Sequence, residues 1–234
     1  MRRLLGPGLM SLAMFATLMG LGVWQLHRLA WKQALLAEID AAVARPPAPL
    51  AAVDRSDPFQ RVTVAGRLRT DLTARYGAEV RDGRMGAQVL AVLERGASSP
   101  LLVDLGWAPE GWLLTPGSAP AGGAETSLTG FLRPPEHPGW LSPRDDAPGR
   151  HVYTLDPAAI GAVLGLPGLA PYTLVVLAPE PLPAGAVPQP ALAMPRPPND
   201  HLSYALTWFG LATVLAVVFA LWARKTLTQE GQDR

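Results

Sequence analysis

The sequence contains no cysteine among its 234 residues, and only two of its 20 basic residues, Lys32 and Lys225, are lysine. The absence of cysteine excludes disulfides, thiolate nucleophiles, redox-active cysteine pairs and every cysteine-based zinc, copper or iron–sulfur site. A metal ion or haem would therefore need His, Met, Tyr or carboxylate ligands. Charged residues make up only 17% of the chain and hydrophobic residues 49%, so the chain is more apolar than a typical soluble domain.

The net charge is +1 and the basic residues are scattered, so the chain lacks the basic patch that neutralises nucleic-acid phosphates. The usual signatures of nucleotide-binding loops, zinc proteases and serine hydrolases are also missing. A triad can be drawn from Ser142, Asp145 or Asp146, and His151, but the segment 142–149 (SPRDDAPG) is typical of turns. We therefore expect no nucleic-acid partner, no catalytic residues and no enzymatic activity.

Two long runs carry no charged residue, 4–26 and 202–223. At a rise of about 1.5 Å per residue, a helix over either run exceeds the bilayer's hydrocarbon core of about 30 Å. The alternative for the first run is a signal peptide, because Met1-Arg2-Arg3 precedes it. The run is longer than the apolar part of such a peptide and reaches Trp24 without a small-residue cleavage site, so we expect it to be retained.

Basic residues near the ends of the spans predict their orientation. Arg2 and Arg3 precede the first run, Arg224 and Lys225 follow the second, and only Arg196 closely precedes the second. This balance predicts that both termini are cytoplasmic and that the segment between the spans is periplasmic. The preference for Arg over Lys, with abundant Ala, Gly and Pro, is typical of a GC-rich bacterial genome, so we expect a multi-pass protein of the bacterial inner (plasma) membrane.

The segment between the spans holds 24 of the 25 prolines, so it cannot be helical throughout. Strand-like runs bounded by Gly and Pro clusters cover 61–68, 87–93, 100–107, 127–132, 151–155 and 172–178. One helix interrupts them, because Asp156 can cap it, Pro157 suits its first position and Gly165 suits its left-handed end. We therefore predict an α+β fold in which N- and C-terminal transmembrane helices flank a periplasmic domain with a mostly antiparallel sheet and one or two short helices.

The first helix is expected to continue beyond the membrane and to stop at Arg45-Pro46-Pro47. The segment 179–198 contains eight prolines and is expected to be an extended, semi-rigid strap. The predicted parts are a cytoplasmic N-terminus (1–3), a first transmembrane helix (4–26), a helical stalk (27–45), the periplasmic domain (46–178), the strap (179–200), a second transmembrane helix (201–223) and a cytoplasmic tail (224–234).

Small residues recur about every four positions in both apolar runs, a spacing that lets helix backbones approach closely. They are Ala13, Ala16, Thr17 and Gly20 in the first run, and Ala212, Ala216 and Ala220 in the second. The spacing predicts that the spans pack on each other or on another membrane protein, although Ala and Gly are frequent throughout the chain.

The outer ends of the two spans carry polar and aromatic residues in matching positions. Gln25, Arg28 and Lys32 follow i, i+3, i+7 spacing on the first helix, with Trp24 and Trp31 beside them. This spacing predicts that the three polar side chains share one face.

The second helix repeats this spacing with His201, Tyr204 and Trp208, just after the pair Asn199-Asp200, which is suited to cap the helix. If the helices are neighbours, the two faces form a pocket at the lipid–water boundary. The simpler interpretation is an aromatic and basic belt, which we prefer for the tryptophans and Lys32.

His201 is the candidate metal ligand. It lies in the first turn of the second helix, where the positive end of the helix dipole favours the neutral, metal-ligating imidazole, although Asp200 has the opposite effect. An imidazole can be an axial ligand of haem iron. A solvated or hydrogen-bonded histidine is the common alternative, whereas ionisable residues near a membrane are candidates for function.

Five blocks of sequence, in order along the chain, carry a family resemblance. They are 21–26 (LGVWQL) with Arg28, Leu29, Trp31 and Lys32; 59–66 (FQRVTVAG); 102–109 (LVDLGWAP); 130–133 (GFLR); and 199–209 (NDHLSYALTWF). On these blocks the chain resembles the Surf1 (Shy1) family of assembly factors for haem–copper cytochrome c oxidase. The first and last blocks, at the ends of the two spans, are the most specific.

The resemblance implies two transmembrane helices around a periplasmic or intermembrane-space domain, a role in maturing the catalytic subunit of the oxidase and, for bacterial members, binding of haem a. The histidine that opens the second span is the implicated haem ligand, here His201. Two positions depart from the family pattern: Leu105 stands where the family usually has Arg, and Arg144-Asp145-Asp146 replaces an acidic–amide pair. We expect these departures to affect partner contacts of the domain more than the haem site.

The leading hypothesis is a non-catalytic carrier that binds haem a transiently and assists its delivery to the catalytic subunit of cytochrome c oxidase. His201 would ligate the haem iron, and Tyr204 and Trp208, with Trp24 nearby, would flank the ring. Arg28, with Gln25, would meet the propionates, because guanidinium pairs well with carboxylate. Haem a synthase is a further candidate partner besides the lipid bilayer. The alternative is a haem-independent scaffold that stabilises the nascent oxidase subunit.

Overall fold

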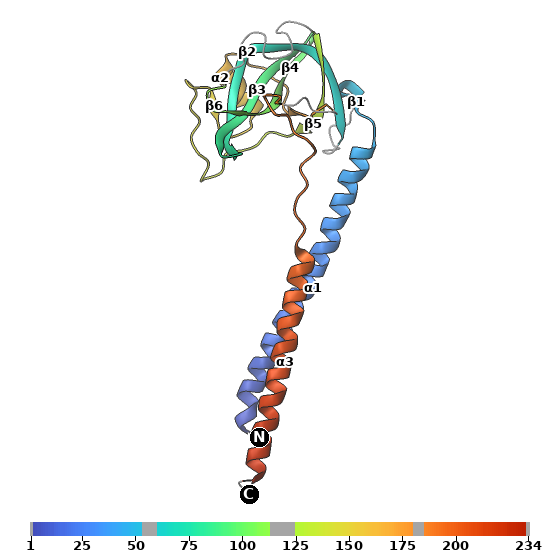
Figure 1. Ribbon diagram of the computed structural model, residues 1–234, viewed down its shortest axis with the longest axis vertical. Coiled ribbons are helices and arrows are strands. Elements are labelled where there is room, and N and C mark those ends of the chain that lie inside the picture. Colours follow the sequence, from blue (N-terminus) through green and yellow to red (C-terminus); the bar gives the residue numbers. More distant parts are fainter. Residues whose placement is uncertain (1, 53–59, 113–124, 180–184, 233–234) are drawn as a thin grey trace. The chain divides into compact units, whose positions relative to one another are not determined.

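The computed structural model of the chain describes residues 2–52, 60–112, 125–179 and 185–232. The chain divides into two compact units (Figure 1). One comprises Met1–Glu38 with Arg196–Arg234, and the other comprises Ile39–Pro195. Phe59, which begins one of the blocks of the family resemblance, lies outside the described residues.

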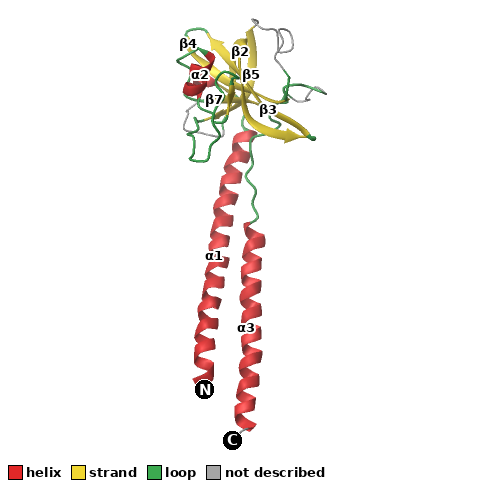
Figure 2. Cartoon of the chain, turned by 90° about the vertical axis from the view of Figure 1, so that its left-hand side faces the viewer, coloured by secondary structure: helices red, strands yellow, loops and turns green. Residues whose placement is uncertain are grey.

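The first unit is a pair of helices, formed by the larger part of α1 (Arg2–Ala44) and by α3 (His201–Gln232). The helices run antiparallel, with the two chain termini at the same end of the pair (Figures 1 and 2). A Cβ atom added to Gly8 would lie 3.6 Å from the ring of Phe219, and one added to Gly22 would lie 2.5 Å from the ring of Phe209. Both helices are long and apolar enough to cross a membrane, as the apolar runs predict.

Each helix buries one stripe of residues spaced alternately by three and four positions, which is the pattern of a left-handed helix pair. The stripe on α1 is Leu4, Gly8, Ser11, Phe15, Leu18, Gly22, Gln25, Leu29 and Lys32, and that on α3 is His201, Ala205, Trp208, Ala212, Leu215 and Phe219.

The spans pack on each other, one of the two predicted alternatives, but of the predicted small residues only Ala212 lies in this contact. Ala13, Ala16, Thr17, Gly20, Ala216 and Ala220 are all exposed. A repeat of four residues turns by about 40° more than one full helical turn, so it drifts away from the contact. The small residues in the contact are Gly8, Gly22, Ala205 and Ala212.

The second unit is built on a closed β-barrel. Its strands are β1 (Ala48–Pro49), β2 (Arg61–Arg81), β3 (Arg84–Arg95), β4 (Ser98–Pro109), β5 (Glu125–Arg133), β6 (His151–Val152) and β7 (Thr173–Val176). The order β2-β3-β4-β7-β5 closes because β5 also pairs with β2. Only β4–β7 is parallel within this ring, and the short strands β1 and β6 add parallel pairs to β2. The predicted mostly antiparallel α+β domain is confirmed, but its closure was not foreseen.

Closure depends on the length and the bend of β2. Its residues 61–67 pair with β5, and its residues 67–81 pair with β3. The register shifts between Arg69 and Thr73 and again between Tyr76 and Glu79, and such bulges bend a strand. Gly66 stands where the partners change, and a Cβ atom there would lie 2.3 Å from the backbone oxygen of Glu94. The predicted strand 61–68 covers only the first part of β2.

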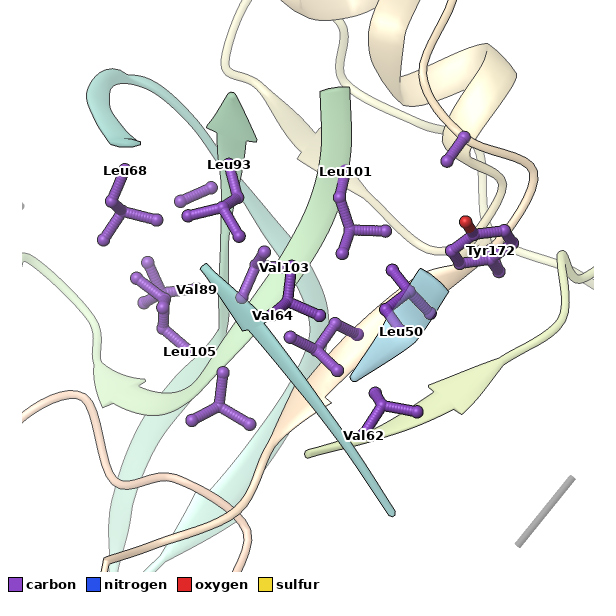
Figure 3. Close-up of a cluster of buried hydrophobic side chains, with 14 of the residues drawn as sticks. Leu50, Val62, Val64, Leu68, Val89, Leu93, Leu101, Val103, Leu105 and Tyr172 are labelled. Carbon is purple, nitrogen blue, oxygen red and sulfur yellow. The ribbon is translucent and has the colours of Figure 1, made fainter. Parts of the chain in front are cut away.

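Two hydrophobic cores lie on the two faces of the barrel wall. Odd-numbered residues of β3 and β4, such as Val89 and Val103, join Val64 and Leu174 in one cluster (Figure 3). Even-numbered residues, such as Leu90 and Leu102, pack with the helix α2 (Pro157–Leu164) in the other. Strands β3 and β4 are therefore buried on both faces, which explains their nearly continuous apolar sequence.

The ends of the helices follow the predicted signals. The Oδ1 atom of Asp156 accepts a hydrogen bond from the backbone N–H of Ala158 at 3.0 Å, and Gly165 ends α2 with a φ of 69°. The first helix α1 ends at Ala44, directly before Arg45-Pro46-Pro47. A 3-10 turn, Leu50–Ala52, follows β1.

The part of the proline-rich segment 179–198 that contains Gln189 and Met194 lies against the barrel. The backbone N–H groups of Trp107 and Gln189 donate to each other's carbonyl oxygens at 2.9 and 2.7 Å, and Met194 is buried. Gly106 has a φ of 111°, and a Cβ atom there would lie 2.0 Å from the Gln189 oxygen. This close approach explains why glycine precedes Trp107.

Leu105, one of the two departures from the family pattern, belongs to the cluster inside the barrel and is 9% exposed. The expectation that it affects partner contacts is therefore corrected, because the side chain packs in the core. Arg144, at the other departure, is exposed on a loop.

Candidate functional site

The candidate site lies within the helix pair, where α3 begins beside α1. The Nδ1 atom of His201 is 2.7 Å from the Oε1 atom of Gln25. An amide oxygen only accepts hydrogen bonds, so Nδ1 donates, and in the neutral imidazole Nε2 then carries the lone pair. Gln25 is only 9% exposed, so its side chain is held among the apolar residues of the helix contact.

This arrangement suits a histidine that binds a metal through Nε2. Metal-ligating histidines nearly always donate their other ring N–H to an acceptor, which fixes the tautomer and the ring orientation. The carbonyl of Gln25 is therefore committed to His201, which adds support of the imidazole to the propionate contact expected of Gln25, whose NH2 group can still donate to a carboxylate.

Two buried polar atoms near His201 have no hydrogen-bond partner. They are the Oδ1 atom of Asn199 and the Nε1 atom of Trp208, and the described residues contain only two others, Arg61 Nε and Thr173 Oγ1. Leaving a buried polar atom unpaired costs about 1–3 kcal/mol, so an unpaired acceptor just before His201 and an unpaired donor about two turns after it suggest a site for a polar ligand. The capping role expected of Asn199 is not observed, because its side-chain oxygen bonds nothing.

Two cations lie near one indole on α1. The guanidinium carbon of Arg28 is 4.0 Å from the ring centroid of Trp31, and the Nζ atom of Lys32 is 5.8 Å from it. In the described part of the chain no carboxylate pairs with either cation. The aromatic face orients both charges, and both remain available for an anionic group.

The sequence predicted two sets of three residues that share a helix face, one on each helix, and the structure divides both sets. Gln25 and Lys32 lie on the stripe of α1 that faces α3, whereas Arg28 is exposed beside it. On α3, His201 and Trp208 lie on the stripe that faces α1, whereas Tyr204 is 56% exposed.

Trp24, the sixth predicted site residue, is 55% exposed and lies off the stripe. The structure thus brings together His201 and Gln25, places Trp208 about two turns further along the same stripe, and leaves Trp24, Arg28 and Tyr204 exposed.

Sequence reasoning missed two features of the site. It did not pair Gln25 with His201, although each is a polar residue in an otherwise apolar stripe, and such residues bury well only when they bond each other. It also assigned Trp31 to a membrane belt, whereas the ring is the platform for two cations.

The residues considered for a hydrolytic triad bond other groups. Ser142 Oγ accepts from the backbone N–H of Gly139, Asp145 and Asp146 accept from backbone N–H groups, and the Nε2 atom of His151 is 2.7 Å from the Gly77 oxygen. Over residues 2–52, 60–112, 125–179 and 185–232, no group of three or more His, Asp or Glu side chains is arranged to hold a metal ion.

The sequence was compared with protein families and with curated proteins. The model of the SURF1 family matches residues 12–213, which include both helices of the candidate site. The chain belongs to the SURF1 family. A SURF1-like protein from Rickettsia felis is 27% identical over 230 residues, which cover 94% of this chain and 98% of that protein.

Animal relatives are similar over most of the chain. Surfeit locus protein 1 from Mus musculus is 27% identical, over 90% of this chain and 72% of that protein. The human Surfeit locus protein 1 is 26% identical, over 90% of this chain and 74% of that protein. The predicted family resemblance is confirmed.

Proposed function

We propose that this SURF1 protein is a membrane-anchored, non-catalytic assembly factor for haem–copper cytochrome c oxidase, and that it carries haem a on His201 for delivery to the catalytic subunit. Membership of the SURF1 family supports a role in oxidase assembly in general. The finer proposal, haem a as cargo, is carried by one observation: the hydrogen bond from His201 Nδ1 to Gln25 Oε1 leaves Nε2 as a preset ligand atom.

Anchoring in a bilayer is supported by the outer surfaces of α1 and α3. Large apolar side chains are exposed along both helices, among them Leu9, Met10, Leu206 and Leu221, and so extensive an apolar surface requires a non-aqueous environment. The threonines of these helices are Thr17, Thr207, Thr213, Thr226 and Thr228, and each donates its hydroxyl to the carbonyl four residues earlier. No threonine hydroxyl is therefore left unpaired toward lipid.

The orientation follows from the basic residues. Arg2 and Arg3 at one end of α1, and Arg224 and Lys225 near the same end of the antiparallel pair, favour a cytoplasmic position for both termini. The barrel domain is then periplasmic, in a protein of the bacterial inner membrane.

The residues of the site fit haem a as cargo. His201 Nε2 would hold the iron, and a single protein ligand would suit a carrier that must release its load. Trp208 offers an unpaired indole N–H to a polar substituent of the ring. Arg28 and Lys32, held over Trp31, offer two cations to two propionates. Tyr204 and Trp24, both exposed on the rim, cover the edges of the ring.

The test is co-purification of haem from cells that make haem a. His201→Ala should abolish haem in the purified protein. Gln25→Leu should reduce haem occupancy by about 10-fold or more, because losing the hydrogen-bond partner of a ligating histidine typically costs about 10–100-fold in metal affinity. Gln25→Glu retains an acceptor and should bind more haem than Gln25→Leu. Gln33→Leu is the matched control, because Gln33 is an exposed glutamine on the same helix.

The readouts are the haem-to-protein ratio and the visible spectrum of the bound haem. Equal haem in the wild type and in His201→Ala would overturn the assignment of the ligand. Absence of haem from the wild type as well would instead favour the haem-independent scaffold, which needs the helices and the domain but no iron ligand.

A further inference from the structure

The loop between β5 and α2 presents two large apolar side chains to solvent. Trp140 is 93% exposed and Leu141 is 74% exposed. Both occupy the centre of a turn in which the backbone N–H of Ser142 donates to the Gly139 oxygen at 3.1 Å and Ser142 Oγ accepts from the backbone N–H of Gly139 at 2.8 Å. The turn is therefore built to hold the two side chains outward.

The base of the loop is fixed to the domain. Glu136 forms an ion pair with Arg133 and accepts hydrogen bonds from the hydroxyl of Tyr76 and the backbone N–H of Leu155. Further along the loop, the backbones of Asp146 and His151 bond each other at 2.8 and 3.0 Å. A loop held at both ends keeps its exposed tip without an ordering cost on binding.

The charges of the loop are distributed unevenly. Its acidic residues are engaged, since Glu136 pairs with Arg133, and Asp145 and Asp146 accept backbone N–H groups at 2.7 and 3.2 Å. Arg144 is exposed and has no partner within the described residues. The tip, 138–144, therefore combines an indole, an aliphatic side chain and the cation of Arg144, and the two carboxylates that follow it each accept a backbone N–H.

We propose that the Trp140–Leu141 turn docks on the surface of a bilayer containing anionic lipids. Tryptophan and arginine are the side chains preferred at the lipid–water interface, where the ring enters the headgroup layer and the cation meets phosphate. The inference rests on the proposed anchoring of α1 and α3 in the membrane, which keeps the domain at a high effective concentration near a bilayer surface.

The size of the tip favours lipid over a protein partner. A tryptophan and a leucine together bury about 300–400 Å², whereas a stable protein interface buries about 800 Å² on each side. A tethered domain needs far less contact than a free partner, because the translational cost of association is already met by the anchor.

The chain has no cysteine, so Leu141→Cys gives a single labelling site in the full-length protein. A nitroxide on this cysteine is largely apolar, although it is larger than leucine. The protein is placed in nanodiscs of phosphatidylcholine and phosphatidylglycerol, and the accessibility of the label to oxygen and to a water-soluble nickel complex is measured. Val80→Cys is the matched control, because Val80 is a 60% exposed apolar side chain of the same domain.

The expected result is an oxygen-to-nickel accessibility ratio at position 141 at least threefold above that at position 80. Adding Trp140→Ser should return the ratio at position 141 to that of the control. A label at Val214→Cys, on an exposed position of α3, reports whether the helices are in the bilayer.

Water accessibility at position 141 with lipid accessibility at position 214 would overturn the docking of the turn and leave the anchoring intact. Water accessibility at both positions would overturn the anchoring as well. Protection of position 141 from both oxygen and nickel would indicate a protein contact, which also overturns the proposal.

Discussion

Replacing Asp104 by asparagine should remove a specific pH dependence from the stability of the barrel domain. Asp104 lies on β4, is only 5% exposed, and accepts a hydrogen bond from the backbone N–H of Gly106 at 2.9 Å. Burial raises the pKa of this carboxyl from 3.8 to about 6, against the opposing effects of the Gly106 hydrogen bond, Arg133 and Arg81, and with a small addition from Glu79.

The direction of this pH dependence follows from which state of the protein, folded or unfolded, binds the proton. Below pH 3.8, the pKa of Asp104 in the unfolded chain, the carboxyl is protonated in both the folded and the unfolded protein. Between pH 3.8 and about 6, it is protonated only in the folded protein. The free energy of unfolding therefore falls as the pH rises through this window. A shift from 3.8 to about 6, at 1.36 kcal/mol per pKa unit, corresponds to about 3 kcal/mol, present below pH 4 and lost above pH 6.

The assay is urea unfolding of the full-length protein in detergent, followed by tryptophan fluorescence from pH 4 to pH 7.5. The measured quantity is the free energy of unfolding of Asp104→Asn minus that of the wild type. This difference should rise by about 3 kcal/mol between pH 4 and pH 7.

Other titrating groups cancel in the difference because both proteins contain them. Asp71 is one of them, since its ion pair with Arg69 holds its pKa at about 2. A difference that stays constant across the pH range would refute the reasoning that burial of the Asp104 carboxyl raises its pKa.

Four other substitutions, one of them the control Leu192→Ala, test the packing and the cap of α2, each by its effect on the free energy of unfolding in urea. Gly66→Ala should cost about 1–3 kcal/mol, because the added methyl group would meet the backbone oxygen of Glu94; an unchanged midpoint would contradict that contact. Leu102→Ala should cost about 2–5 kcal/mol, because Leu102 is fully buried, whereas Leu192→Ala, at a side chain 75% exposed, should change stability by less than about 0.5 kcal/mol. Asp156→Ala removes the cap of α2 and should cost about 1 kcal/mol, and a neutral result would mean that the cap contributes nothing.

The helices were predictable because their signals are local. The cap at Asp156, the proline at position 157 and the glycine at position 165 act within one helical turn, and all three occupy the predicted positions. The end of α1 at Ala44 follows from the two prolines after Arg45.

The second part of β2 was not predictable in this way. Its exposed charges resemble a loop, yet Arg69 pairs with Glu94 of β3. The strand is defined by its partner across the sheet, and a single sequence does not reveal which residues will be neighbours.

The candidate site was also predictable from the sequence only in part. Spacing alone singled out Gln25 and His201 as polar residues at the outer ends of two apolar runs. Their hydrogen bond depends on the antiparallel register of α1 and α3, which is decided by close packing at Gly22 and Phe209.

The sequence by itself therefore determined the composition of the two apolar helices, their ends, the family and the identity of the candidate ligand, because each depends on residues close together in the chain. Only the tertiary structure decided that the sheet closes into a barrel, that Leu105 is a core residue and that Gln25 supports His201. These features arise between residues far apart in sequence, where the geometry of packing selects one pairing among many that the pattern allows.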